Sequence, residues 1–166
     1  MLEIEMQELL ALISELAIAF AGFTGIVAVM GNLMTNGLLR MRIAAIMVCA
    51  FGTMILSLIP MVMASFSISE SSIWFWSNLL LAAYLLSVIA LGPWINRLRR
   101  SHKDLFSIPA IIVGYASPAL GSIFGLIGLF SSDSAAGWFV AGLVFYLAGC
   151  LFLFVRAILT ARENIA

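Results

Sequence analysis

The chain has 166 residues and no net formal charge; 64% of its residues are hydrophobic, 10% are charged, and its mean hydropathy is +1.18. A soluble domain of this length needs more polar surface to cover its core, so most of the surface is expected to face lipid. Zero net charge gives no general attraction to nucleic acid or to acidic substrates. The N-terminal residues have neither a basic region nor a small-residue cleavage site, so the first apolar segment is interpreted as a retained membrane helix.

Five apolar segments follow one another along the chain. They cover residues 9–30, 43–66, 73–95, 108–130 and 137–159. Each is long enough to cross a hydrocarbon core of about 30 Å, which takes about 20 helical residues. Backbone polar groups cannot stay unpaired in lipid, so all five are predicted to be helices, and the short connections favour antiparallel neighbours. We therefore expect an all-α membrane protein, with residues 1–166 forming one domain, a bundle of five transmembrane helices.

The charged residues predict how this bundle lies in the membrane. The basic residues, eight in all, follow the first and third segments or end the fifth: Arg40, Arg42, Arg97, Arg99, Arg100, Lys103, Arg156 and Arg162. The opposite side carries only acids, namely Glu3, Glu5, Glu8, Glu70 and Asp133. Because basic residues stay in the cytoplasm, the N-terminus is predicted outside and the C-terminus in the cytoplasm.

Glu15 is the only acid well inside an apolar segment, about 9 Å below the outer end of its helix at a rise of 1.5 Å per residue. A charged carboxylate at that depth is costly unless it is hydrated, paired or protonated. Four polar residues fall in the outer half of the other helices: Ser57, Asn78, Ser122 and Tyr146. Depth matching therefore predicts an ion-binding or polar cluster with Glu15 as its acid. The alternative is a protonated Glu15 with a purely structural role.

Small residues recur at helical spacing and predict close helix contacts. The glycines assigned to such contacts are Gly22, Gly25, Gly52, Gly114, Gly121, Gly125 and Gly128. Gly121 and Gly125 form a GxxxG pair, which lets two helix backbones approach closely. These faces are expected to pack inside the bundle, and the alternative is a seam between copies or the lining of a pore.

The residues that usually carry catalysis or bind metals are sparse and scattered. Cys49 and Cys150 each lie in an apolar run without a second ligand at metal-binding spacing, so they are expected to be buried, reduced thiols. His102 falls in a basic loop, where a solvated role is expected. Neither a Ser and His pair nor two buried acids is present. The sequence therefore predicts a protein that is not an enzyme and has no metal site or cofactor.

The connection after the third segment is strongly basic. Arg97, Arg99, Arg100 and Lys103 could bind anionic lipid headgroups at about 1 kcal/mol per basic residue. The simpler interpretation is a topology signal alone.

The first helix contains Glu15-Leu16-Ala17-Ile18-Ala19-Phe20-Ala21-Gly22-Phe23-Thr24-Gly25. This stretch resembles the first helix of small uncharacterised bacterial integral membrane proteins with an AFAGF-type motif. The resemblance is confined to this helix and implies no activity, but it implies a location in the bacterial cytoplasmic (inner) membrane.

Taken together, these patterns favour a homo-oligomeric, channel-like protein that conducts a cation or small solute. This hypothesis rests on the acidic outer side and the intramembrane Glu15, because carboxylate rings attract cations. It also rests on the small-residue stripes, which permit close assembly of several copies. The alternative is a non-catalytic accessory or scaffold subunit of a larger membrane complex. A secondary transporter fits less well, because an odd number of helices cannot divide into two equal repeats. The expected partners are the lipid bilayer and either further copies of the chain or another membrane subunit, with no nucleic acid.

Overall fold

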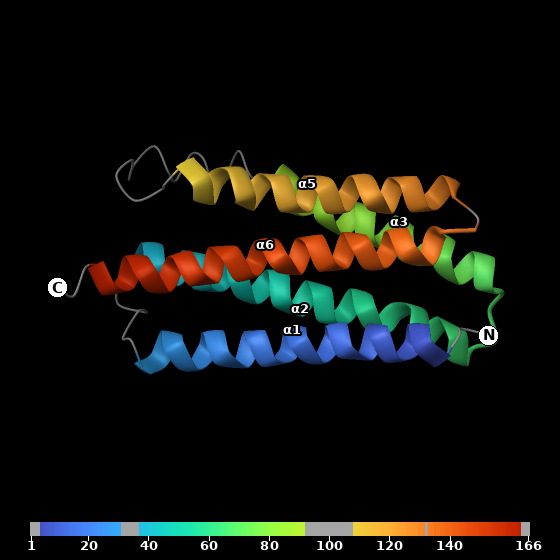
Figure 1. Ribbon diagram of the computed structural model, residues 1–166, viewed down its shortest axis with the longest axis horizontal. Coiled ribbons are helices and arrows are strands. Elements are labelled where there is room, and N and C mark those ends of the chain that lie inside the picture. The colour runs from blue at the N-terminus through green and yellow to red at the C-terminus, as the bar shows by residue number, and fades with distance from the viewer. Residues whose placement is uncertain (1–3, 31–36, 92–107, 132, 164–166) are drawn as a thin grey trace.

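The computed structural model describes residues 4–30, 37–91, 108–131 and 133–163. Within them lie five α-helices and no strand (Figure 1): α1 (Ile4–Met30), α2 (Gly37–Ser65), α3 (Glu70–Ala90), α5 (Ile108–Phe130) and α6 (Ala135–Glu163). Each helix contains a stretch long and apolar enough to cross a membrane. The predicted all-α bundle of five transmembrane helices is therefore confirmed, and the chain is a multi-pass membrane protein.

Several helices extend beyond the apolar segments that predicted them. α1 begins at Ile4, α2 begins at Gly37, and α6 continues to Glu163. Hydropathy marks the part of a helix that lies in hydrocarbon, and a helix can continue past it into the headgroup region, where polar side chains are solvated. α3 ends at Ala90 with Leu91 as its C-cap, and residues 92–95 of the predicted segment lie outside the described residues.

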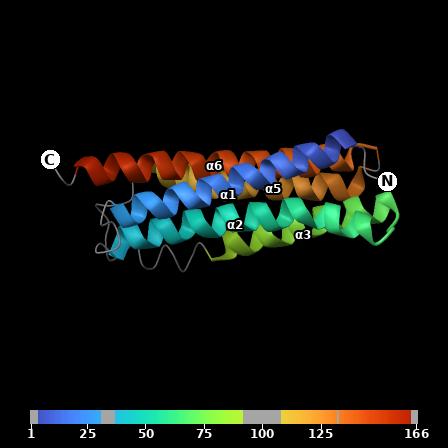
Figure 2. The ribbon, with the colours of Figure 1, turned by 90° about the horizontal axis from the view of Figure 1, so that it is seen from below.

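The five helices run side by side along one axis, and the two termini lie at opposite ends of the bundle (Figures 1 and 2). α6 packs closely on α5 and also contacts α2 and α3, while α3 packs on α5 and α2. α1 packs chiefly on α2 and has only a small contact with α6. The four helices α2, α3, α5 and α6 thus form a closed bundle, and α1 lies on its edge.

Large apolar side chains fill the space between the helices. The fully buried ones include Leu81 and Leu85 of α3 with Phe139, Leu143 and Tyr146 of α6. The other faces expose many large apolar side chains, with Phe23, Ile55, Leu86, Ile123 and Leu151 as one example from each helix. Exposed apolar surface on this scale is expected of helices that face lipid.

Two tight turns lie at the N-terminal end of the bundle, which is the end where α1 begins. After α2, the amides of Phe66 and Ser67 donate to the carbonyls of Met63 and Ala64, each at 3.2 Å, and Ser67 adopts the left-handed φ of 57°. Before α6, the backbone amide of Trp138 donates to the Ser134 carbonyl at 3.1 Å. These local bonds satisfy groups that a helix end leaves unpaired.

Candidate functional site

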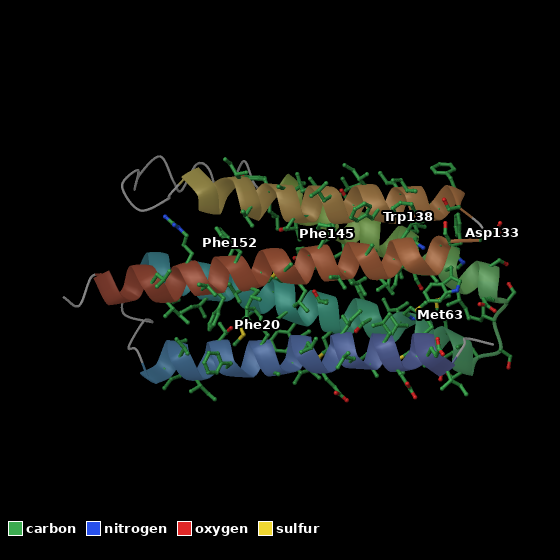
Figure 3. The ribbon with its side chains drawn as sticks, viewed as in Figure 1. Phe20, Met63, Asp133, Trp138, Phe145 and Phe152 are labelled. Atoms are coloured by element: carbon green, nitrogen blue, oxygen red, sulfur yellow. The ribbon has the colours of Figure 1, made fainter. Side chains whose placement is uncertain are left out.

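Glu15 lies on the side of α1 that points away from the other helices. Its side chain is exposed, and its neighbours Leu12 and Leu16 are 51% and 52% exposed. Exposed residues continue along this side at alternating spacings of four and three: Glu8, Leu12, Glu15, Ala19, Gly22 and Ile26. We call these six residues the Glu15 face. Figure 3 shows oxygen-tipped side chains extending from the free side of α1.

The Glu15 face is open along its small residues. A Cβ atom built on Gly22 would meet no other atom within 4 Å, and Ala19 is exposed as well. A smooth helix surface with small side chains is the kind that lets a second helix approach closely in lipid. The structure therefore leaves one small-residue stripe of this chain uncovered.

Within a single chain, the structure does not bring Glu15 together with the four polar residues assigned to its cluster. α1 carries a second stripe of small residues, Ser14, Ala17, Ala21, Thr24 and Ala28, and that stripe is buried against the bundle. Successive residues of a helix differ by about 100° around its axis, so burying Ser14 turns the adjacent Glu15 outward. Glu15 is exposed, whereas the four residues assigned to it are all buried.

Those four residues are bonded separately. The hydroxyls of Ser57 and Ser122 donate to carbonyls of their own helices, those of Met54 and Ala119, each at 2.8 Å. Tyr146 donates to Cys49, and Asn78 donates to backbone carbonyls. None of these bonds joins two members of the predicted set. They are buried polar residues in different places of one core.

Asn78 connects three helices at the N-terminal end of the bundle. Its amide nitrogen donates to the carbonyl of Trp74 at 2.9 Å and to that of Ala135 at 3.0 Å. A Cβ atom on Gly128 would collide with the Asn78 amide, so α5 approaches α3 at this point because residue 128 is a glycine. Among the described residues, the Asn78 Oδ1 and the hydroxyl of Ser77 are buried without a hydrogen-bond partner.

A second polar cluster lies deeper in the bundle, and sequence reasoning missed it. The Tyr146 hydroxyl donates to the sulfur of Cys49 at 3.1 Å, and the Tyr84 hydroxyl lies 3.4 Å from that of Tyr146. Tyr84 also donates to the carbonyl of Val48 at 2.9 Å. Cys150 is also buried, one turn after Tyr146 on α6. Cys49 looked isolated in the sequence because its partner Tyr146 comes from another helix.

The glycines assigned to packing differ in what they contact. A Cβ on Gly121 would come within 3.1 Å of the Gly142 carbonyl of α6, and one on Gly125 within 3.2 Å of the backbone of α3. Gly52 faces the Tyr84 hydroxyl so closely that a Cβ would collide with it. Gly25 and Gly114 have looser contacts, with Met47 at 3.4 Å and Leu153 at 4.0 Å. Five of the seven assigned glycines therefore face other helices at 3.4 Å or less, and they are Gly25, Gly52, Gly121, Gly125 and Gly128.

The basic loop assigned to lipid headgroups, with Arg97, Arg99, Arg100 and Lys103, lies outside the described residues. In the part of the chain that the structure describes, no group of three or more His, Cys, Asp or Glu residues could hold a metal ion. No protein-family model, curated protein or solved structure matches this chain.

Proposed function

We propose that this chain is a subunit of a homo-oligomeric, cation-conducting protein of the bacterial inner membrane, with its copies meeting on the Glu15 face. The observation that supports the proposal is the position of Glu15: an exposed carboxyl group within the membrane-spanning stretch of α1. Intramembrane acids are rare in lipid and usually face a water-filled cavity or a partner.

Among the described residues of a single copy, no basic side chain lies at the depth of Glu15. The basic residues with described side chains, Arg40 and Arg156, belong to the opposite end of the helices, near the start of α2 and the last turns of α6. An isolated charge at the centre of a membrane helix costs about 2.5–3.5 kcal/mol on insertion scales. A water-filled seam between copies removes most of that cost.

The same geometry supports a conduction path that runs between copies. Within one bundle, large side chains such as Phe139, Leu143 and Tyr146 occupy the space between the helices. On the Glu15 face, Ala19 and Gly22 allow close approach of a second α1, and Glu8 and Glu15 follow each other on the same side. Carboxylates arranged around a seam attract cations and lower the barrier to their entry.

The second candidate function is an accessory subunit of a larger membrane complex. The same exposed carboxyl group supports it, because a basic side chain from a different protein would neutralise Glu15 within the membrane. In that arrangement the Glu15 face binds the foreign subunit and conducts nothing.

The Glu15→Gln variant distinguishes these functions, because glutamine keeps the size and hydrogen-bonding capacity and removes the charge. For the channel, purified wild-type protein runs as a defined homo-oligomer and carries cation flux in vesicles. Glu15→Gln is then expected to keep the oligomer and lower flux about tenfold or more, since about 1.4 kcal/mol of lost attraction already gives that factor. The readouts are the mass of the detergent-solubilised protein and a fluorescence assay of cation uptake.

Three outcomes decide between the candidates. A wild-type monomer that carries no flux of any small cation contradicts the channel. Co-purification of a foreign subunit that Glu15→Gln releases supports the accessory role instead. A Glu15→Gln variant that behaves as wild type in mass, flux and co-purifying chains contradicts both, and leaves Glu15 a structural group.

A further inference from the structure

Three aromatic side chains lie together where α5 packs on α6, apart from the Glu15 face. The ring centroid of Phe124 of α5 lies 5.6 Å from that of Trp138 and 5.2 Å from that of Phe145, both of α6. Phe145 is 47% exposed, so the set presents aromatic surface to lipid. In Figure 3, Trp138 and Phe145 follow each other along the side of α6 that faces α5. We call these three residues the aromatic seam.

The aromatic seam is held in place by close backbone packing and by a hydrogen bond. A Cβ atom on Gly121 of α5 would come within 3.1 Å of the Gly142 carbonyl of α6, so the two helices pack with their backbones close together. The indole nitrogen of Trp138 donates to the Ser134 hydroxyl at 3.1 Å, which restrains the indole ring. A lipid that contacts the seam therefore meets a preformed surface, and binding orders few side chains.

A carboxyl group lies at the headgroup end of the aromatic seam. Asp133 is exposed and falls between the span that ends at Phe130 and the span that begins at Ala135, so it lies at headgroup depth. It directly precedes Ser134, which accepts the hydrogen bond of the Trp138 indole. A carboxylate accepts up to about four hydrogen bonds, so it can hold a lipid ammonium group beside other partners. Aromatic faces, and that of Trp most strongly, also attract ammonium groups.

The charges at this end of the bundle favour a headgroup that ends in an ammonium group. The described charged residues there are all acids: Glu5, Glu8, Glu70 and Asp133. Phospholipids with a net negative charge are repelled by these carboxylates. Phosphatidylethanolamine has no net charge, and its primary ammonium group donates N–H bonds that a carboxylate accepts. A choline headgroup has no N–H group and cannot donate in this way.

We propose that Asp133 and the aromatic seam form a binding site for one phosphatidylethanolamine molecule of the adjacent leaflet. The Asp133 carboxylate accepts hydrogen bonds from the ammonium group, and the indole face of Trp138 packs beside it. One acyl chain lies along the exposed ring of Phe145.

The depth of each ring agrees with this arrangement. Trp138 lies three residues and Phe145 ten residues into the span that begins at Ala135, which is about 5 and 15 Å at 1.5 Å per residue. One leaflet of the hydrocarbon core is about 15 Å deep, so an acyl chain from this side reaches Phe145. Phe152, also exposed and labelled in Figure 3, lies seven residues further and belongs to the opposite leaflet.

The test titrates the purified full-length chain in detergent with dioleoyl phosphatidylethanolamine or dioleoyl phosphatidylglycerol and counts bound lipids by native mass spectrometry. The wild type is expected to bind one phosphatidylethanolamine per chain, about fivefold more tightly than phosphatidylglycerol. Asp133→Asn should bring the two affinities within about twofold of each other. Asp133→Lys should reverse the preference, because a basic side chain attracts the anionic lipid. A general loss of folding would not reverse it.

Two matched control variants separate this site from general lipid contact. Phe145→Ala should weaken phosphatidylethanolamine binding about threefold or more, whereas Phe152→Ala removes an exposed ring beyond the reach of that lipid and should not. Trp138→Leu should lower the preference for phosphatidylethanolamine, whereas Trp76→Leu removes another exposed indole and should leave it unchanged. Elution profiles show whether each variant folds as the wild type does.

Any of three results would overturn the proposal. The first is wild-type protein that binds the two lipids equally well. The second is an Asp133→Lys variant that keeps the wild-type preference. The third is a pair of control variants, Phe152→Ala and Trp76→Leu, whose effects equal those of the variants in the aromatic seam.

Discussion

At the scale of single residues, Asn78 illustrates what a buried polar side chain does in a membrane bundle. Its amide links α3 to the first residue of α6 and lies next to Gly128 of α5. Hydrocarbon offers no competing water, so such a bond between helices persists once it forms. Its sequence position showed only that Asn78 was polar and near the end of its span. The partners, a backbone carbonyl and a glycine, carry no distinctive side chain and could not be identified in advance.

Asn78→Ala is expected to lower the free energy of unfolding in detergent by about 1–3 kcal/mol, from the lost bonds and the cavity that remains. Ser57→Ala is the control, because the Ser57 hydroxyl is also fully buried but bonds only within its own helix, to Met54. Ser57→Ala should therefore have the smaller effect. Unfolding followed by circular dichroism measures both, and equal losses would show that the bond to Ala135 does not link the helices.

At the scale of helices, the sequence identifies small-residue stripes but not the direction in which each one faces. α1 has two such stripes, on largely opposite sides of its axis, and only packing shows that Ser14, Ala17 and Ala21 face inward. The rotation of a helix depends on its neighbours, so a spacing rule alone cannot select between them. For the same reason, depth matching groups Glu15 with four polar residues that lie buried, while Glu15 itself is exposed. In α5 a single side is rich in glycine, and Gly121 and Gly125 both meet other helices there.

Two glycine-to-leucine variants separate packing within the chain from assembly between chains. Gly121→Leu should destabilise the bundle, because the new side chain collides with the Gly142 backbone of α6 and with Leu85 of α3. Gly22→Leu should leave the fold intact, because nothing lies within 4 Å, and should weaken the proposed oligomer. Thermal unfolding and detergent-solubilised mass report the two effects. A Gly22→Leu variant with unchanged mass would exclude a seam on this face.

At the scale of the whole molecule, the helices could be predicted because the length and hydropathy of each segment are properties of that segment alone. The contacts between helices that are distant in the sequence could not be predicted from these properties. The hydrogen bond from Tyr146 to Cys49 depends on how α2 and α6 are rotated against each other, which neither segment determines alone. The orientation of the bundle in the membrane is predicted from the charged residues in the connections, and it does not depend on any contact between helices.

The orientation prediction is tested with reporters and cysteine labelling. A reporter fused after Ala166 should be active in the cytoplasm, and Ser69→Cys or Ser134→Cys should react with an impermeant maleimide added to intact cells. The background is Cys49→Ser with Cys150→Ser, and lysed cells show the maximal labelling. Reaction of Ser101→Cys from outside would contradict five crossings with the N-terminus outside.

The position of α1 at the edge of the bundle also affects how the folded protein unfolds locally. α1 is secured mainly by α2 and by edge contacts of Phe20 and Phe23 with Phe154 of α6, at ring-centroid distances of 5.0 and 5.7 Å (Figure 3 labels Phe20). A helix with few contacts detaches at a lower free energy than the rest, so amide hydrogens of α1 should exchange before those of α5 and α6. A partner bound to α1 and α2 together would oppose that detachment, and it would slow the exchange of α1 in proportion to its own occupancy.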